Sequence, residues 1–177
     1  MSFSSRPHSP SDWVRHRLCA LAAIVTAFAA EHLAISSAPA APGTKFAVIV
    51  SPDVELPACS LTELRRLFGL DRQFWNAGHP VVVLLPAAGS GTHTFLLRRV
   101  YRTDVGGLKR LMLEKLYRGE IDLAPKTVSS DREAVSFVAS SKGLIAVVPA
   151  GLTAGAGVRT LRIEGKLPGD PGYPLTE

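Results

Sequence analysis

The sequence predicts an α/β domain of three layers around a mostly parallel sheet. Three apolar runs, at 46–50, 81–85 and 144–148, have the length and composition of strands that are covered on both faces. Amphipathic segments of helical period alternate with these runs along the chain. This alternation is typical of parallel strands joined by right-handed helical crossovers. We therefore expect one α/β domain between residues 45 and 177.

The first forty residues have the layout of a secretory signal and a spacer. Three arginines precede a short apolar run at 18–30, and small residues rich in Ser, Ala and Pro follow. A membrane span needs about 20 apolar residues, so the run favours a cleaved signal, with an uncleaved anchor as the alternative. Cleavage after Ala29, Ala30 or Ala40 fits the small residues there. We expect a periplasmic or secreted protein without a membrane span after signal removal.

A helix is expected after the first predicted strand, 46–50. The sequence has a signal for the start of this helix and another for its end. Ser60 and Glu63 form a capping box, and Gly69 follows the last turn. A loop at 71–80 then brings the chain to the strand at 81–85. We expect Trp75 to anchor this loop on the core, with stacking on a ligand as the alternative.

Two helices are expected after the strand at 81–85. The first begins at Thr92 and ends near Tyr101. The second follows Asp104 and has apolar residues on one face. Glu114 and Arg118 are spaced as an i,i+4 ion pair on its outer side.

A second capping box, Ser130 to Glu133, predicts a helix before the last buried strand. A short strand is expected within 121–128. Polar and apolar residues alternate at 158–163, which is typical of an edge strand. The tail from Lys166 is rich in Gly and Pro, and we expect it to be irregular but packed.

The charge balance narrows the classes of partner. The chain has 20 Lys and Arg against 15 Asp and Glu, which gives a formal net charge of +5. This mild, dispersed excess suits a small anion or an acidic envelope surface, and it is too weak to predict binding to nucleic acid. Arg98, Arg99 and Arg102 fall on the outer side of their helix, where a solvated face is the more common meaning.

No sequence pattern predicts an enzyme. A nucleotide-binding loop needs a lysine after the glycine turn, and here Gly91 is followed by Thr92 and His93. A hydrolase elbow needs glycines two places on either side of the serine, whereas Ser90 has Ala88 and Thr92 there. The His, Cys and Asp residues lack metal-ligand spacing, so we expect no metal and no cofactor. A nucleophilic Ser90 is the distant alternative.

The candidate binding site is the turn formed by Gly89, Ser90, Gly91 and Thr92. The two glycines let the main chain turn sharply and approach a ligand, and Ser90 and Thr92 add hydroxyl donors. The start of a helix also leaves N–H groups without partners and carries partial positive charge, which suits an anion. A plain connecting turn with Thr92 as a cap is the equally supported alternative.

Four motifs occur in a characteristic order along the chain. They are Ser60-Leu61-x-Glu63-Leu64-Arg65-x-x-Phe68, Trp75-x-x-Gly78, Gly89-Ser90-Gly91-Thr92 and Gly143-Leu144-Ile145. Together they resemble the phosphate-binding proteins of bacterial ABC-type phosphate importers, in the type II periplasmic binding protein superfamily. Such proteins close two α/β lobes around phosphate, and the chain looks like the single lobe that bears the glycine-serine-glycine-threonine turn. The resemblance implies that Ser90, Gly91 and Thr92 donate hydrogen bonds to phosphate.

The chain departs from the family pattern beside that turn. Pro86 stands where the resemblance leads one to expect an arginine, and Ala88 stands where it implies an acidic residue that accepts from a protonated oxyanion. Losing two charge-assisted bonds would cost roughly 3 to 6 kcal/mol, or about two to four decades of affinity. We therefore expect weak or degenerate binding of phosphate or a similar oxyanion, with a partner chain or a homodimer covering the site. The alternative is an envelope protein-interaction module that keeps the fold without a ligand.

Overall fold

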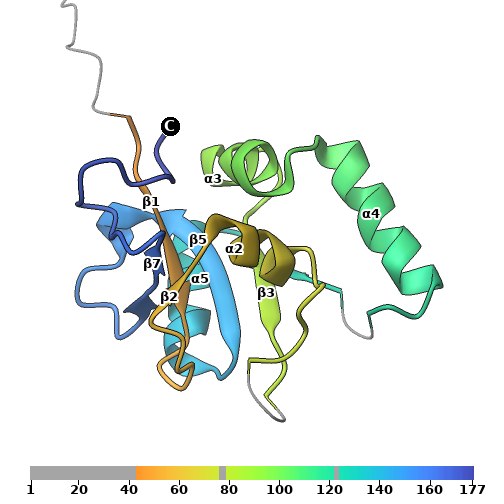
Figure 1. Cartoon of the computed structure of the whole chain (residues 1–177), viewed down its shortest axis with the longest axis horizontal. Coiled ribbons are helices and arrows are strands. Elements are labelled where there is room, and N and C mark those ends of the chain that lie inside the picture. The colour runs from red at the N-terminus through yellow and green to blue at the C-terminus, as the bar shows by residue number, and fades with distance from the viewer. Residues whose placement is uncertain (1–42, 76–78, 122–123) are drawn as a thin grey trace, which may run out of the picture. The chain divides into compact units, whose positions relative to one another are not determined.

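The computed structural model describes residues 43–75, 79–121 and 124–177, which belong to one compact unit (Figure 1). The expected signal and spacer at 1–40 lie outside the described residues. Within the described part, no helix is both long enough and apolar enough to cross a membrane.

A five-stranded sheet in the order β4-β3-β5-β1-β6 forms the middle layer. Its strands are β1 (Phe46–Val50), β3 (Val82–Leu85), β4 (Lys126–Thr127), β5 (Leu144–Pro149) and β6 (Arg159–Thr160). Strand β3 pairs in parallel with β4 and β5, whereas β1 pairs antiparallel with β5 and β6. Four strands therefore run in one direction and β1 runs in the other. The α/β class with a mostly parallel sheet is confirmed, as is the short strand expected within 121–128.

The direction of β1 differs from the expectation of a parallel strand. All five residues of β1 are buried. Phe46, Val48 and Val50 contribute to the core on one face of the sheet, and Ala47 and Ile49 to the core on the other. A continuous apolar run therefore indicates that both faces of the strand are covered by helices or loops. It does not indicate whether the strand is parallel or antiparallel to its neighbours.

The helices follow the expected caps closely. They are α2 (Leu61–Phe68), α3 (Gly91–Leu96), the π-helical segment η1 (Leu97–Tyr101), α4 (Val105–Tyr117), α5 (Asp131–Ser140) and the short 3-10 segment η2 (Ala150–Leu152). The Ser60 hydroxyl accepts from the Glu63 N–H at 3.0 Å, and the Ser130 hydroxyl accepts from the Glu133 N–H at 3.2 Å. Helix α3 begins one residue before the expected Thr92, because Ser90 rather than Thr92 is its N-cap.

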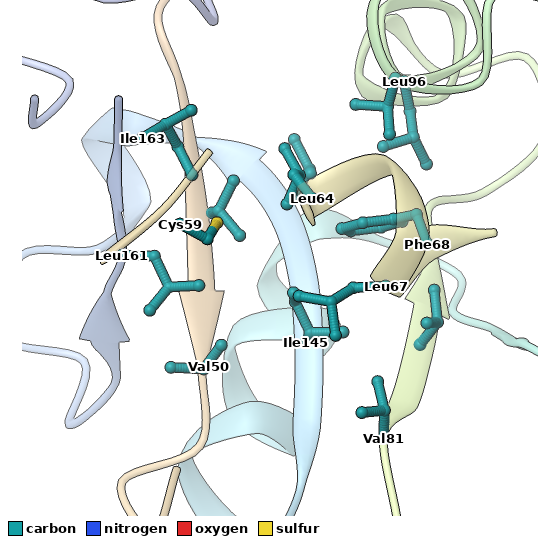
Figure 2. Packing of buried hydrophobic residues seen from close by; sticks show 14 of the residues in the cluster. Val50, Cys59, Leu64, Leu67, Phe68, Val81, Leu96, Ile145, Leu161 and Ile163 are labelled. Atoms are coloured by element: carbon teal, nitrogen blue, oxygen red, sulfur yellow. The ribbon is translucent and has the colours of Figure 1, made fainter. Parts of the chain in front are cut away.

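Helix α2 and the α3–η1 segment cover one face of the sheet. Figure 2 shows Leu64, Leu67 and Phe68 of α2 together with Ile145 of β5 in the core between the helix and the sheet. The Phe95 ring of α3 stacks on Phe46 of β1 with the ring centres 3.9 Å apart. Burying side chains of this size stabilises the domain by about 1.5 to 3 kcal/mol each.

Helix α5 covers the opposite face and completes the third layer. Ala134, Val135 and Val138 are its buried residues. They belong to a second core with Ala47 and Ile49 of β1. The apolar side of α5 therefore packs on the second face of β1. This agrees with the alternation of apolar runs and amphipathic segments along the sequence.

The expected edge strand at 158–163 is divided into two short strands. Strand β6 lies at the edge of the main sheet, and β7 (Arg162–Ile163) pairs in parallel with β2 (Ala58–Cys59) in a separate ribbon. Leu161 between them is buried. The alternating pattern thus marks which residues are buried but does not show where the chain changes from one sheet to another.

The loop at 71–80 and the tail have the expected roles. The Trp75 ring is buried, and its Nε1–H donates to the Gly143 carbonyl at 2.8 Å. Trp75 is thus an anchor on the core. The tail is irregular, and Tyr173 and Leu175 bury their side chains in the core. The Phe46 N–H donates to the Leu175 carbonyl at 3.0 Å, so the tail also closes over the start of β1.

Helix α4 departs most from expectation. Leu108 is its only buried residue, and Leu111, Leu113, Leu116 and Tyr117 are exposed. Figure 1 shows α4 projecting away from the sheet beyond α3. The expected pair of Glu114 with Arg118 is absent among the described residues, since Arg118 instead lies 3.6 Å from Glu120. The apolar face of α4 therefore has little of the domain to pack against.

Candidate functional site

The turn 89–92 lies where the two parallel strands β3 and β4 end. Each strand leads into a helix, β3 into α3 and β4 into α5, so both helices begin at the same edge of the sheet. The Thr92 hydroxyl donates to Asp131 Oδ2 at 2.8 Å and joins the first turns of the two helices. Ligands of open α/β sheets bind at the carboxyl ends of the strands, so this edge is the expected place for one.

The turn itself is open above its glycines. Gly89 has φ +82°, a left-handed conformation that glycine adopts without strain. A Cβ atom added at Gly89 or at Gly91 would meet nothing within 4 Å. The Ser90 N–H donates to the Ala87 carbonyl at 3.1 Å and closes the turn. The structure thus leaves space beside both glycines, which a ligand would need.

Two main-chain donors at the start of α3 are not used by the fold. Among the described residues, no hydrogen bond takes up the N–H of Gly91 or of Thr92. The next N–H, that of His93, donates to the Ser90 hydroxyl at 3.1 Å. Gly91 is exposed, whereas Thr92 is buried. The first turn of α3 therefore presents the positive end of a helix with donors available.

The two hydroxyl groups of the turn have different hydrogen-bonding roles. Thr92 gives its proton to Asp131, so that proton is not available to a ligand in this arrangement. Ser90 acts as an acceptor for the His93 N–H and keeps its own proton. The residues that the sequence singled out are therefore adjacent at one edge of the sheet. Their donation to an oxyanion stays a prediction.

Asp131 is the site residue that sequence reasoning missed. It is the first residue of α5, directly after the N-cap Ser130, and it is partly exposed. Its carboxylate lies beside Thr92, although Ala88 in the turn has no acidic group. The available signal was an acidic residue at the start of a second helix after a parallel strand. The sequence pattern by itself predicts only a capping box at this position.

Nucleophilic and metal chemistry find no support here. Burial, together with the charges of Glu63 and Glu164, raises the pKa of the Cys59 thiol to about 12, which keeps it protonated. The Ser90 oxygen is bonded to the main-chain N–H of His93, not to its ring. In the ranges that the structure describes, no group of three His, Cys, Asp or Glu residues could hold a metal ion.

Comparison by sequence finds no matching family model and no match among curated proteins. Comparison by structure finds similar folds at low sequence identity. PstS from Borrelia burgdorferi has a TM-score of 0.59 at 12% identity, over 77% of this chain and 55% of that protein. An ABC-type phosphate transport receptor from Vibrio cholerae has a TM-score of 0.56 at 15% identity, over 72% and 49%.

A third solved structure contains bound phosphate. It is described as a phosphate ABC transporter substrate-binding protein from Clostridium perfringens with bound phosphate, with a TM-score of 0.56 at 14% identity over 71% of this chain and 47% of that one. The present chain thus spans about half the length of the solved structures that it matches. Its fold is that of a single lobe of the substrate-binding proteins of phosphate ABC transporters.

Proposed function

We propose that this protein binds a small oxyanion, phosphate before others, at the turn formed by Gly89, Ser90, Gly91 and Thr92. The observation that carries the proposal is the meeting of two helix N-termini at the carboxyl ends of parallel strands, joined by Thr92 and Asp131. Two helix dipoles converge there on one place, and the Gly91 N–H and the Ser90 hydroxyl remain as donors. The likeness in fold to proteins that are named for phosphate transport supports this choice of ligand.

The Asp131 carboxylate favours an oxyanion that carries a proton. A carboxylate only accepts hydrogen bonds, so it would repel a fully ionised anion and would accept from the hydroxyl of hydrogen phosphate. Sulfate has no proton at neutral pH. Asp131 would thus supply on α5 the acceptor that Ala88 does not supply in the turn, and we expect phosphate to bind better than sulfate.

The affinity of the isolated chain should be low. Pro86 provides no charge beside the turn, and Thr92 has already given its hydroxyl proton to Asp131. A partner chain or a second copy that covered the turn would exclude water and add donors, and each charge-assisted bond would contribute about 1.5 to 3 kcal/mol. We accordingly propose an exported, extracytoplasmic, non-enzymatic role as a binding component that acts with a partner.

Titration calorimetry with phosphate and with sulfate tests the proposal. Ser90→Ala removes the hydroxyl donor of the turn and the cap of α3, and it should weaken phosphate binding several-fold. Ser60→Ala is the matched control, because Ser60 caps α2 with the same geometry away from the turn. Equal binding by the two variants, or no heat with any oxyanion at millimolar concentration, would contradict the proposal.

Asp131→Asn separates the role of the acidic group from that of the amides. The substitution removes the charge and keeps an oxygen that can accept from Thr92. The preference for phosphate over sulfate should then shrink or reverse, while Glu133→Gln, two residues further along α5, should leave it unchanged. An unaltered preference in Asp131→Asn would mean that the carboxylate takes no part in selecting the anion.

A second candidate function is an envelope protein-interaction module, and the exposed apolar side of α4 favours it. Leu113 is 41% exposed, Leu116 48% and Tyr117 86%. A photo-crosslinking residue at Tyr117 should capture a defined envelope protein, whereas the same residue at Arg132, on the exposed side of α5, should not. Equal, diffuse labelling from both positions would argue against such a module.

A further inference from the structure

An arginine-lined pocket lies away from the turn 89–92, between α2, the end of η1 and the C-terminal segment. Its volume is about 180 Å³. The lining consists of the four arginines Arg65, Arg98, Arg99 and Arg102 and the apolar residues Leu61, Pro174 and Leu175. We propose that this pocket, here called the arginine pocket, is a second anion site that binds a phosphoryl group.

None of the four arginines has an acidic partner within the part of the chain that the structure describes. The ion pairs among the described residues use Arg72, Lys115 and Arg118 as cations, and none uses an arginine of the pocket. The described residues that line the pocket include no Asp or Glu. Burial and the neighbouring charge of Arg102 lower the pKa of the Arg65 guanidinium. Like charges that are held together without counter-charges repel each other, and a bound anion would remove that repulsion.

Two of the guanidinium groups are held in place by the fold. Arg65 Nη2 donates to the Arg99 carbonyl at 3.3 Å, and Arg99 Nη2 donates to the Thr176 carbonyl at 3.1 Å. The Nε of Arg65 is buried and has no acceptor among the described residues. An oxyanion that approached this guanidinium side-on would supply the missing acceptor, and the arginine would lose little rotamer freedom on binding.

The backbone at the rim has an unusual conformation. Residues Leu97–Tyr101 form a π-helical segment, and Arg102 ends it with φ +54° and ψ +40°, in the left-handed region. A left-handed conformation is strained for a residue other than glycine, and such strain and π turns both concentrate at functional sites. The same turn brings the Arg102 side chain to the lining of the pocket.

The size and chemistry of the pocket favour a single phosphoryl group. A volume of about 180 Å³ has room for one phosphoryl group. Planar guanidinium groups match the oxygens of phosphate in pairs. Leu61, Pro174 and Leu175 give an apolar wall that could contact the organic part of a phosphate ester. Free phosphate and a lipid phosphomonoester share this chemistry.

The arginine pocket and the turn can be studied separately. They lie toward opposite ends of the continuous helix from Gly91 to Tyr101, whose eleven residues span about 16 Å at 1.5 Å per residue. A substitution in the pocket should therefore leave binding at the turn unchanged. Ser90→Ala should in turn leave binding at the pocket unchanged, so failure of one proposal can be told from failure of the other.

The test is an NMR titration of the full chain with inorganic phosphate at low ionic strength. We expect the Arg65 Nε–H signal of the wild-type chain to move downfield. The apparent Kd, read from the backbone amide signals of Arg99 and Thr176, which both double variants keep, should rise about tenfold or more in Arg65→Gln/Arg102→Gln. Arg66→Gln/Arg110→Gln is the control of equal charge, since both residues are exposed and lie outside the pocket lining. The same Kd in both double variants, or an Arg65 signal that phosphate does not move, would overturn the proposal.

Vesicles distinguish the source of the phosphoryl group. Cosedimentation with phosphatidic acid vesicles that is lost in Arg65→Gln/Arg102→Gln but kept in Arg66→Gln/Arg110→Gln would assign a lipid ligand. Titration with free phosphate alone, without cosedimentation, would assign a soluble ligand, and both results support the site. Cosedimentation that is equal for the two double variants, together with no effect of phosphate, would overturn it.

Discussion

The Thr92 hydroxyl and the Asp131 carboxylate, 2.8 Å apart in space and 39 residues apart in the chain, join the first turns of two helices. Each helix follows a strand of the same parallel pair. This bond therefore fixes the relative position of the two helix N-termini at the edge of the sheet. It also places an acidic acceptor beside a turn that the sequence had singled out for its donors.

This bond should have a measurable coupling energy. A hydrogen bond to a charged group contributes about 1.5 to 3 kcal/mol. In a double-mutant cycle of Thr92→Val and Asp131→Ala, urea unfolding should give a coupling energy of at least about 1 kcal/mol. The pair Thr153→Val and Asp131→Ala serves as the control, because Thr153 bonds to the Ala150 carbonyl instead. A coupling near zero would show that the two helix ends are not held by this contact.

Gly143 should tolerate alanine much less well than Gly119. Both have left-handed φ, +70° and +65°, so alanine costs about 1 to 2 kcal/mol at either position. A Cβ at Gly143 would also lie 2.5 Å from the Pro80 carbonyl oxygen, whereas nothing lies within 4 Å at Gly119. Thermal unfolding should therefore show a clearly larger loss of stability for Gly143→Ala. Equal losses would mean that the loop at Pro80 moves aside.

Removing the indole donor of Trp75 should destabilise the domain. Trp75→Phe keeps an aromatic ring buried but removes the 2.8 Å indole bond to the Gly143 carbonyl, which still accepts from the Val82 N–H at 2.9 Å, so the expected cost is about 0.5 to 1.5 kcal/mol. Urea unfolding followed by circular dichroism measures this loss. Phe74→Leu is the neighbouring control, since Phe74 is 57% exposed and should change stability by less than about 0.5 kcal/mol. A Trp75→Phe variant as stable as Phe74→Leu would exclude the anchoring role.

The Cys59 thiol should make stability fall at alkaline pH. Its pKa is raised from 9.0 to about 12 by burial first and by Glu63 and Glu164 second, so the folded state holds the proton more firmly than the unfolded state. The stabilisation is complete below pH 9 and is lost as the pH rises from 9 toward 12, by up to about 1.4 kcal/mol per pH unit.

The sequence has one other cysteine, Cys19, whose thiol would titrate as well. Unfolding of Cys19→Ser between pH 8 and pH 10.5 therefore measures the effect of Cys59. Cys19→Ser/Cys59→Ala should show a shallower pH dependence, and the difference isolates Cys59 from the buried tyrosines, whose pKa values burial also raises. The folded Cys19→Ser protein should also react slowly with a thiol reagent at pH 8. Rapid labelling without denaturant would contradict a buried, protonated thiol.

The sequence contained most of the fold because the relevant signals are local. Ser60 and Ser130 cap the predicted helices, and the apolar runs become the central strands. The direction of β1 and the division of 158–163 between two sheets depend on distant partners, which period and composition do not specify. The solvent exposure of α4 likewise depends on where the helix projects, and its amphipathic pattern alone cannot show this.

The candidate site was predictable only in part for the same reason. The turn 89–92 is one continuous motif and could be found from sequence alone. Asp131 reaches it through the pairing of β3 with β4, and the arginine pocket combines α2, η1 and the chain end. A π turn and the left-handed Arg102 have no clear sequence signal, so the sequence favours a solvated helix face for Arg98, Arg99 and Arg102 and does not link them to Arg65.

The position of β1 between β5 and β6 has a consequence for folding kinetics. Ile49 pairs with Ala146 on one side and with Thr160 on the other, each roughly one hundred residues later in the chain. Closing such long loops costs conformational entropy before the contacts between their ends stabilise the chain. Folding therefore slows as contacts become less local. Strand β1, made early by the ribosome, must wait for the last part of the chain before the domain can form.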